Sequence, residues 1–181
     1  MRFGSLVALI PLALGWAATS ARPDLRVVPE VDLGRYAGRW FEIARLPNRF
    51  QSKCASEVTA VYTPRPDGRL TVTNRCRRAD GGVDEAVGIA RRVPGRPASI
   101  LEVRFAPAFL SFLPAVWGDY QIIALDPEYR HALVGTSDRQ FLWVLSRTPR
   151  LETEVLQALL ADAKAQGFDT DAVTRTPRAQ P

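Results

Sequence analysis

The sequence predicts an all-β fold, a closed antiparallel barrel with one α-helix packed on its outside. Short β-rich segments follow one another between residues 38 and 147, and turns rich in Gly, Pro and Asp separate them. Gly38-Arg39-Trp40 begins this run, and Ser146-Arg147 ends it. The Trp40 indole and the Arg147 guanidinium can therefore stack over one closed end, a cation–π contact worth about 1–2 kcal/mol when desolvated.

Length and charge limit the classes of partner. The 181 residues suffice for one domain with a sizeable core, and the formal net charge is +5. Basic patches can bind nucleic acid through its phosphates. No DNA- or RNA-binding motif accompanies the many arginines, so nucleic acid is not expected as a partner. A solvated basic face and attraction to anionic lipid headgroups are the remaining interpretations.

Residues 1–21 have the pattern of a secretion signal. Arg2 precedes an apolar run at 6–16 that is too short to span a bilayer, and small residues follow it at 17–21. A retained membrane anchor is the alternative. No cysteine precedes Cys54, so the lipid-anchor motif of lipoproteins is missing. We expect a periplasmic or secreted protein that starts near Arg22, possesses an N-terminal extension at 22–30 and can associate with the outer membrane.

Cys54 and Cys76 flank a predicted hairpin whose turn contains Asp67-Gly68. In an exported protein this placement predicts a disulfide, which contributes about 3 kcal/mol by closing a loop of this size. A reactive thiol and metal ligation are the alternatives. Two cysteines and the single histidine, His131, do not make a convincing zinc site, so no metal is expected.

The β-rich segments number eight, and a helix follows them. The helix is predicted at 151–166, with Thr148 as its N-cap, Pro149 at its first position and Gly167 as its stop. The barrel and helix together occupy 31–174, Val173 and its neighbours add a short final strand, and 175–181 form a disordered tail. The eight strands are expected at 38–46, 56–63, 69–77, 83–92, 99–105, 117–125, 130–136 and 140–147.

Three blocks of sequence carry a family resemblance. They are 35–50 (RYAGRWFEIARLPNRF), 118–134 (beginning GDYQIIALD) and 141–149 (FLWVLSRTP). On these blocks, the chain from about Val31 to Val173 resembles the lipocalins, most closely the branch of bacterial outer-membrane lipocalins and apolipoprotein D. The resemblance implies an eight-stranded up-and-down barrel that is wide enough for one small ligand.

Strand alternation assigns the inward-facing side chains of such a barrel. In the last strand, Trp143 shares the parity of Arg147 and should point inward, while Leu142 and Val144 lie under the helix. Gly88 and Ala90 should leave volume unfilled. A solidly packed core is the alternative. The predicted ligand-binding set is Glu42, Ala44, Gly88, Ala90, Leu101, Val103, Phe105, Tyr120, Ile122, Phe141 and Trp143; Ala124 and Leu145 share the inward parity.

Glu42 has two interpretations. A carboxylate that faces an apolar cavity is costly unless it is paired. It could hydrogen-bond a buried ligand group, or a neighbour such as Asn74 or Tyr120 could satisfy it.

The loops at the open end are expected to select the ligand headgroup. Positive charge there suits a carboxylate or phosphate, and the sequence offers it at Arg49, Lys53, Arg77 and Arg78. Loop 106–116 concentrates Phe109, Leu110, Phe112 and Leu113. An apolar loop of this kind predicts contact with a membrane surface, with a second copy in a homodimer, or with the barrel itself as a lid.

These features favour a carrier of fatty acid or lysophospholipid in the bacterial cell envelope, without catalytic groups or a cofactor. Two alternatives stay open. A lipid-modifying enzyme would need a reduced Cys54 thiol facing the cavity, and a haem or tetrapyrrole binder would need His131 as a ligand.

Overall fold

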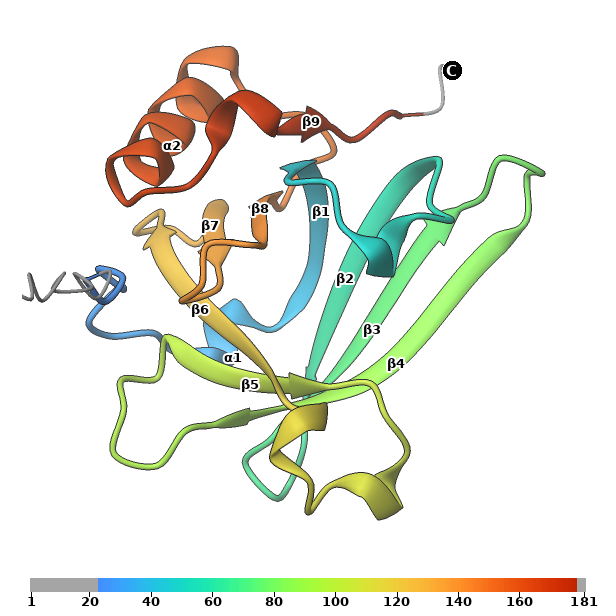
Figure 1. Ribbon diagram of the computed structural model, residues 1–181, viewed down its shortest axis with the longest axis vertical. Helices are drawn as coiled ribbons and strands as arrows, with labels where there is room; N and C mark the ends of the chain where they lie inside the picture. Colours follow the sequence, from blue (N-terminus) through green and yellow to red (C-terminus); the bar gives the residue numbers. More distant parts are fainter. Residues whose placement is uncertain (1–22, 179–181) are drawn as a thin grey trace, which may run out of the picture.

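Eight antiparallel strands close into a barrel in the computed structural model, which describes residues 23–178 (Figure 1). This confirms the predicted fold. The predicted secretion signal, 1–21, lies outside the described residues. The strands are β1 (Gly38–Arg45), β2 (Ser56–Pro64), β3 (Leu70–Arg77), β4 (Val83–Arg92), β5 (Ile100–Arg104), β6 (Gly118–Leu125), β7 (His131–Gly135) and β8 (Leu142–Ser146), with a short ninth strand, β9 (Thr174–Arg175).

The barrel closes where β1 pairs with both β2 and β8. Each of the other strands pairs with its neighbours in sequence, so the topology is up-and-down. The loops between β1 and β2, β3 and β4, β5 and β6, and β7 and β8 consequently lie at one end. The short helix α1 (Leu33–Tyr36), which the sequence did not predict, lies at the other.

Arg147 closes the α1 end of the barrel. Its Cζ atom lies 3.9 Å from the ring centre of Trp40, so the predicted stack is present. The guanidinium also donates to the carbonyl oxygens of Arg39 (2.9 Å) and Arg35 (2.7 Å). Gly38 has φ +93°, and a Cβ there would lie 3.3 Å from Arg147 Nη1. The close approach of the guanidinium and the positive φ together explain this glycine.

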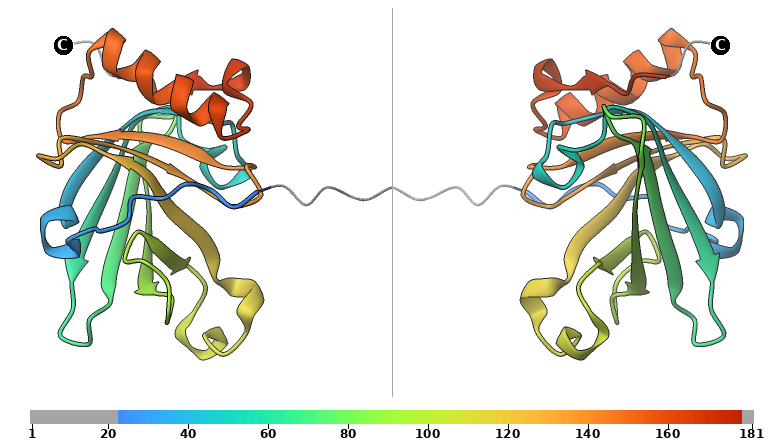
Figure 2. Two further views of the ribbon diagram at one scale, coloured as in Figure 1. Left: turned by 90° about the vertical axis from the view of Figure 1, so that its left-hand side faces the viewer. Right: turned by 90° about the vertical axis from the view of Figure 1, so that its right-hand side faces the viewer.

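Helix α2 (Thr153–Ala165) packs on the outside of the barrel (Figure 2). Its buried residues Leu156, Leu159 and Ala163 contact the outer face of the sheet. The helix begins later than predicted, after Glu152. The Thr148 hydroxyl is not its N-cap, because it bonds instead to the Arg150 carbonyl and to Ser146. The outer-face residues under the helix are Ile43, Ala44, Leu46, Ile123, Leu133, Leu142 and Val144.

Two β-bulges correct the predicted inward set. The register of β1 against β8 shifts between Glu42 and Ala44, and that of β6 against β7 shifts between Ile122 and Ala124. A bulge inserts one extra residue and reverses the faces beyond it. Ala44 and Ala124 therefore pack under α2 instead of lining the interior.

The C-terminal segment also differs from the prediction of a disordered tail at 175–181. β9 pairs with β1 at Ala44 and Arg45, beyond the point where β2 pairs with β1. Thr176 N donates to Ile43 O at 2.9 Å, and the Pro177 carbonyl accepts from Glu57 N at 3.0 Å. Residues up to 178 thus fill the gap that opens between β1 and β2, because unpaired backbone groups there gain partners.

The predicted disulfide is confirmed. Cys54, in the loop after β1, is bonded to Cys76 on β3, with Cα atoms 5.5 Å apart. The bond ties that loop to the barrel wall. Within residues 23–178, no helix combines the length and the apolar character needed to cross a bilayer.

Candidate functional site

The half of the barrel nearest α1 is sealed. Trp40 and Ile122 point inward from β1 and β6 and have no exposed surface, and Ala90 and Leu101 are each 1% exposed. Trp40, Ile122 and Ala90 belong to one cluster with Tyr62, Val72, Val134 and Leu145. Ala90, Leu101 and Ile122, all predicted to contact a ligand, therefore form part of the closed floor.

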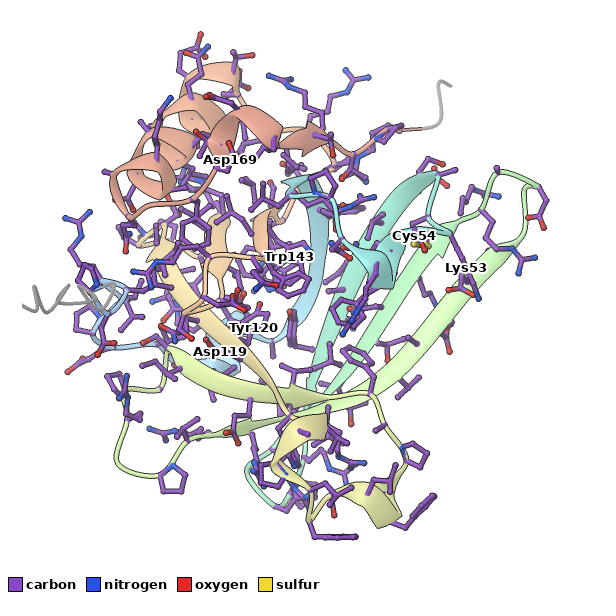
Figure 3. All side chains as sticks on the ribbon, viewed as in Figure 1. Lys53, Cys54, Asp119, Tyr120, Trp143 and Asp169 are labelled. Atoms are coloured by element: carbon purple, nitrogen blue, oxygen red, sulfur yellow. A yellow bond between two sulfur atoms is a disulfide. The ribbon has the colours of Figure 1, made fainter. Side chains whose placement is uncertain are left out.

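Inward-facing side chains nearer the open end keep exposed surface. Tyr120 on β6 and Trp143 on β8 are both partly exposed, although they point inside the ring of strands (Figure 3). Because these side chains face the interior, their exposure means that solvent reaches the barrel from the open end. The partly exposed inward set is Ala60, Asn74, Val103, Tyr120, Phe141 and Trp143.

Three tyrosine hydroxyls meet between the floor and the open half. Tyr120 Oη lies 2.7 Å from Tyr36 Oη and 2.8 Å from Tyr62 Oη. Burial raises the pKa of Tyr62 to about 12 and holds those of Tyr36 and Tyr120 well above the ordinary value. The cluster is therefore neutral at physiological pH.

The tyrosine cluster has one proton more than its two hydrogen bonds use. Either hydroxyl can be the donor in each bond. One of the three hydroxyls therefore has a proton left for a further acceptor, and Tyr120 is the partly exposed member of the cluster.

A polar network lies on the wall formed by β1 and β8. The Glu42 carboxylate, 3% exposed, accepts from Arg45 Nη1 at 2.6 Å and from Gln51 Nε2 and Thr176 Oγ1, each at 2.5 Å. Gln51 Oε1 in turn accepts from Trp143 Nε1 at 2.9 Å. Glu42 is satisfied by these groups and not by the predicted Asn74 or Tyr120.

The rim of the open end is aromatic. Phe50, 65% exposed, lies 5.4 Å from Phe141, whose ring stacks on Trp143 at 5.9 Å. Arg49, a predicted headgroup contact, lies over the Phe50 ring at 5.0 Å. Arg77, another of the predicted headgroup contacts, points outward from β3 and forms an ion pair with Glu57.

Gly88 does not leave empty space. A Cβ there would lie 2.7 Å from the Phe105 ring and from the Arg104 carbonyl. The Phe105 side chain thus takes the volume that the sequence assigned to a ligand. Phe105 itself is 45% exposed at the rim, while Phe109 and Phe112 in the following loop are 74% and 76% exposed.

Sequence reasoning missed several residues of this interior. Tyr62 shares the parity of Ala60 on β2, so strict alternation could have found it. Arg45 faces the Glu42 carboxylate only because the bulge reverses its face. Gln51 comes from a loop and Thr176 from the C-terminal segment, and neither has a periodic pattern that could have indicated it.

The groups needed by the two alternatives are placed elsewhere. Both cysteines of the chain are in the disulfide, which removes the thiol that an enzyme would need. His131 lies on the face of β7 opposite to the inward Ala132 and Val134, with Nε2 3.9 Å from Asp126. Among residues 23–178, no group of three or more His, Cys, Asp or Glu could hold a metal ion.

The chain resembles known proteins along nearly its whole length. Residues 31–178 match the Lipocalin-like domain. The chain is 41% identical to the outer membrane lipoprotein Blc of Escherichia coli over 172 residues, which cover 93% of each protein. It is 29% identical to apolipoprotein D of Mus musculus over 164 residues, covering 87% of this chain and 82% of that protein.

Solved structures show the same fold at low identity. Lobster apocrustacyanin A1 superposes with a TM-score of 0.65 at 17% identity, covering 86% of this chain and 92% of that one. The chain therefore belongs to the lipocalin family, in the branch that holds the bacterial outer membrane lipoproteins and apolipoprotein D.

Proposed function

We propose that this protein binds and carries one amphipathic lipid, a fatty acid or a lysophospholipid, in the open half of its barrel. The observation that supports this most is the contrast along the barrel axis. Trp40 and Ile122 have no exposed surface, whereas Tyr120 and Trp143 are inward-facing and partly exposed. A sealed apolar floor below a solvent-reached wall is the arrangement that a hydrophobic ligand needs.

Burial of an acyl chain supplies enough free energy for this function. Each methylene group removed from water contributes about 0.8 kcal/mol. A chain of about sixteen carbons gains roughly 12 kcal/mol, against an association cost of about 4–15 kcal/mol. At the lower end of that cost about 8 kcal/mol remains, so affinity in the micromolar range is attainable.

Polar groups next to this apolar space favour an amphipathic ligand over a pure hydrocarbon. The tyrosine cluster has three hydroxyl protons and two hydrogen bonds, so one O–H is left to donate. A carboxylate, an ester carbonyl or a phosphate can accept from such a donor, whereas an alkane leaves it unpaired.

We place the protein in the bacterial cell envelope, in the periplasm or at the outer membrane. The Cys54–Cys76 disulfide is stable in an oxidising compartment. The relatives from Escherichia coli and Vibrio cholerae are named outer membrane lipoproteins. Residues 1–21 have the pattern of a secretion signal.

Native mass spectrometry of gently purified protein, followed by lipid extraction, tests the proposal. We expect one acyl lipid per barrel. Ala60→Phe fills the open half from inside β2 and should lower lipid occupancy at least tenfold. Val61→Phe adds the same ring on the outward face of the same strand and should leave occupancy unchanged.

Two outcomes would count against a lipid carrier. One is wild-type protein that is recovered empty and also excludes added fatty acid and lysophospholipid. The other is equal lipid occupancy in Ala60→Phe and wild-type protein, which would put the lipid outside the barrel.

A further inference from the structure

The hydroxyl groups of Tyr36, Tyr62 and Tyr120 form a chain with Tyr120 in the middle. Its Oη atom lies 2.7 Å from that of Tyr36 and 2.8 Å from that of Tyr62. The rings pack edge to face, with centres 5.4 Å apart for Tyr36 and Tyr62 and 6.2 Å apart for Tyr62 and Tyr120. Because this packing holds the three oxygens in place, a further acceptor has to come to the cluster.

One proton of the cluster is not used by its internal hydrogen bonds. The three hydroxyls carry three protons, and the two hydrogen bonds use two of them. Tyr120 can donate to only one neighbour, so at least one neighbour donates to Tyr120. The remaining proton belongs to Tyr36 or to Tyr62 in two of the possible arrangements. It belongs to Tyr120 in the third, in which both neighbours donate to Tyr120.

Only this third arrangement presents the remaining proton to a molecule inside the barrel. Tyr36 has no exposed surface and Tyr62 is 4% exposed, whereas Tyr120 is partly exposed and points inside the ring of strands (Figure 3). Water can accept the proton when solvent fills the open half. An acyl chain that displaces this water leaves the proton unpaired unless the chain itself carries an acceptor. A hydrogen bond that a buried polar group cannot make lowers affinity by about tenfold.

The surroundings of Tyr120 favour an acceptor without charge. Both of its hydrogen-bond partners are phenols that stay neutral, because burial raises their pKa values. A carboxylate can also accept the proton, but at Tyr120 it would be a buried charge with one neutral donor, which is costly. Arg45, on the wall formed by β1 and β8, already pairs with Glu42 at 2.6 Å. A carbonyl or hydroxyl oxygen needs only the one hydrogen bond that the cluster offers.

We propose that the barrel selects acyl chains that carry a neutral oxygen, as a keto or hydroxyl group, on the part of the chain that reaches Tyr120. This oxygen accepts the Tyr120 proton, Tyr36 and Tyr62 both donate to Tyr120, and all three protons of the cluster are then used. The ionised headgroup stays toward the open end, where water reaches it. The inference rests on the proposed function and makes Tyr120 the residue that determines specificity for the chain.

Calorimetric titration with octadecanoic acid and its keto derivatives tests this specificity. The derivatives carry the keto group at carbon 4, 8, 12 or 16. A keto oxygen accepts hydrogen bonds and donates none, so it reports on the tyrosine proton alone. Wild-type protein should bind one or two of these isomers about tenfold more tightly than octadecanoic acid. The remaining isomers should gain nothing, because their oxygen meets no donor.

Tyr120→Phe and Tyr62→Phe remove the same group from different places in the cluster. In Tyr120→Phe no hydroxyl of the cluster reaches the ligand, so the preference for the keto acid should disappear. Octadecanoic acid should bind this variant more tightly than wild type, because it no longer covers an unpaired donor. In Tyr62→Phe, the hydroxyls of Tyr36 and Tyr120 still have two protons and one hydrogen bond, so the preference should remain. A purely structural role of the tyrosines would not separate the two variants in this way.

Infrared spectroscopy of wild-type protein supplies a measurement that does not depend on the folding of a variant. The carbonyl band of the preferred keto acid, labelled with carbon-13, should lie at the frequency of a hydrogen-bonded ketone. A band at the frequency of a ketone in alkane would contradict the proposal.

Two binding results would also overturn this specificity. One is equal affinity of wild-type protein for octadecanoic acid and for all four keto isomers. The other is an undiminished keto preference in Tyr120→Phe. Octadecanoic acid still binds to wild-type protein in both cases, so they differ from failure of the carrier function, in which none of the acids binds.

Discussion

Tyr120 combines two roles at the boundary between the floor and the open half of the barrel. Its hydroxyl binds those of Tyr36 and Tyr62, which closes the floor, and its partly exposed surface faces the open half, where we propose that the ligand binds. Both roles depend on neutral phenols, because a phenolate at this depth would be poorly solvated.

The tyrosine cluster predicts a loss of stability in alkali. The pKa of Tyr62 is about 12 in the folded protein, and it is about 10 for a tyrosine in an unfolded chain. The stabilisation is complete below pH 10 and is lost as the pH rises toward 12, because the unfolded chain releases its protons first. Tyr62 alone contributes about 2–3 kcal/mol to the free energy of unfolding.

Urea unfolding between pH 8 and 11.5 should show this free energy fall as the pH rises, and Tyr62→Phe should make the fall smaller. Three tyrosines ionising in folded protein at pH 10.5, seen at 295 nm, would contradict this account.

Glu42 is predicted to stabilise the wall and not to bind the ligand directly. Glu42→Gln leaves the 14% exposed Arg45 side chain without its carboxylate, which should cost about 3 kcal/mol in urea unfolding. Glu42→Gln/Arg45→Met removes the uncompensated charge as well and should recover part of that loss. A variant Glu42→Gln with unchanged unfolding but weaker lipid binding would assign Glu42 to the ligand instead.

Among the elements, the short C-terminal segment completes the barrel wall beside β1. β9, Thr176 and Pro177 occupy the place beside β1 that β2 leaves after Phe41. Arg178 donates to the Glu42 carbonyl at 2.7 Å, and burial lowers the pKa of its guanidinium. The segment therefore seals the barrel wall beside the polar network.

Ending the chain after Val173 should lower the melting temperature by about 6–12 °C. The deletion removes at least three backbone or charge-assisted hydrogen bonds, each worth about 1 kcal/mol, and 1 kcal/mol shifts the melting temperature of a domain of this size by about 2–4 °C. A chain that ends after Arg178 retains the segment and serves as the control. Equal melting temperatures of the two chains in calorimetry would show that the segment does not seal the wall.

Local patterns predicted these elements unevenly. Turn residues and β-rich composition located all eight barrel strands, because turns and strands are each determined by a few consecutive residues.

The two bulges were not predicted. Strict alternation assigns one face of a strand to each parity, whereas a bulge is determined by pairing with a strand that is distant in sequence. Tyr120 precedes the bulge in β6, Trp143 lies on a strand without a bulge, and both face inward as predicted. Ala44 and Ala124 come after the bulges in β1 and β6, and both face outward. Glu42 acquired its partners from a loop and from the C-terminus, which local patterns do not relate to β1.

For the whole molecule, the structure combines one closed end of the barrel with one open end. Arg147 and Trp40 close one end, and α2 covers one side of the barrel. The loops with Phe50 and Phe109 lie at the other end, where apolar side chains are exposed. A closed floor opposite an exposed apolar rim suits the lipid carrier that we propose.

The most direct test of the account is quenching of Trp143 fluorescence by a fatty acid that carries a nitroxide on its chain. If the lipid occupies the open half of the barrel, quenching should saturate at one equivalent and should be largely lost in Trp143→Phe, although Trp40 and Trp117 remain. Saturation at one equivalent with undiminished quenching in Trp143→Phe would place the lipid outside the barrel and contradict the account.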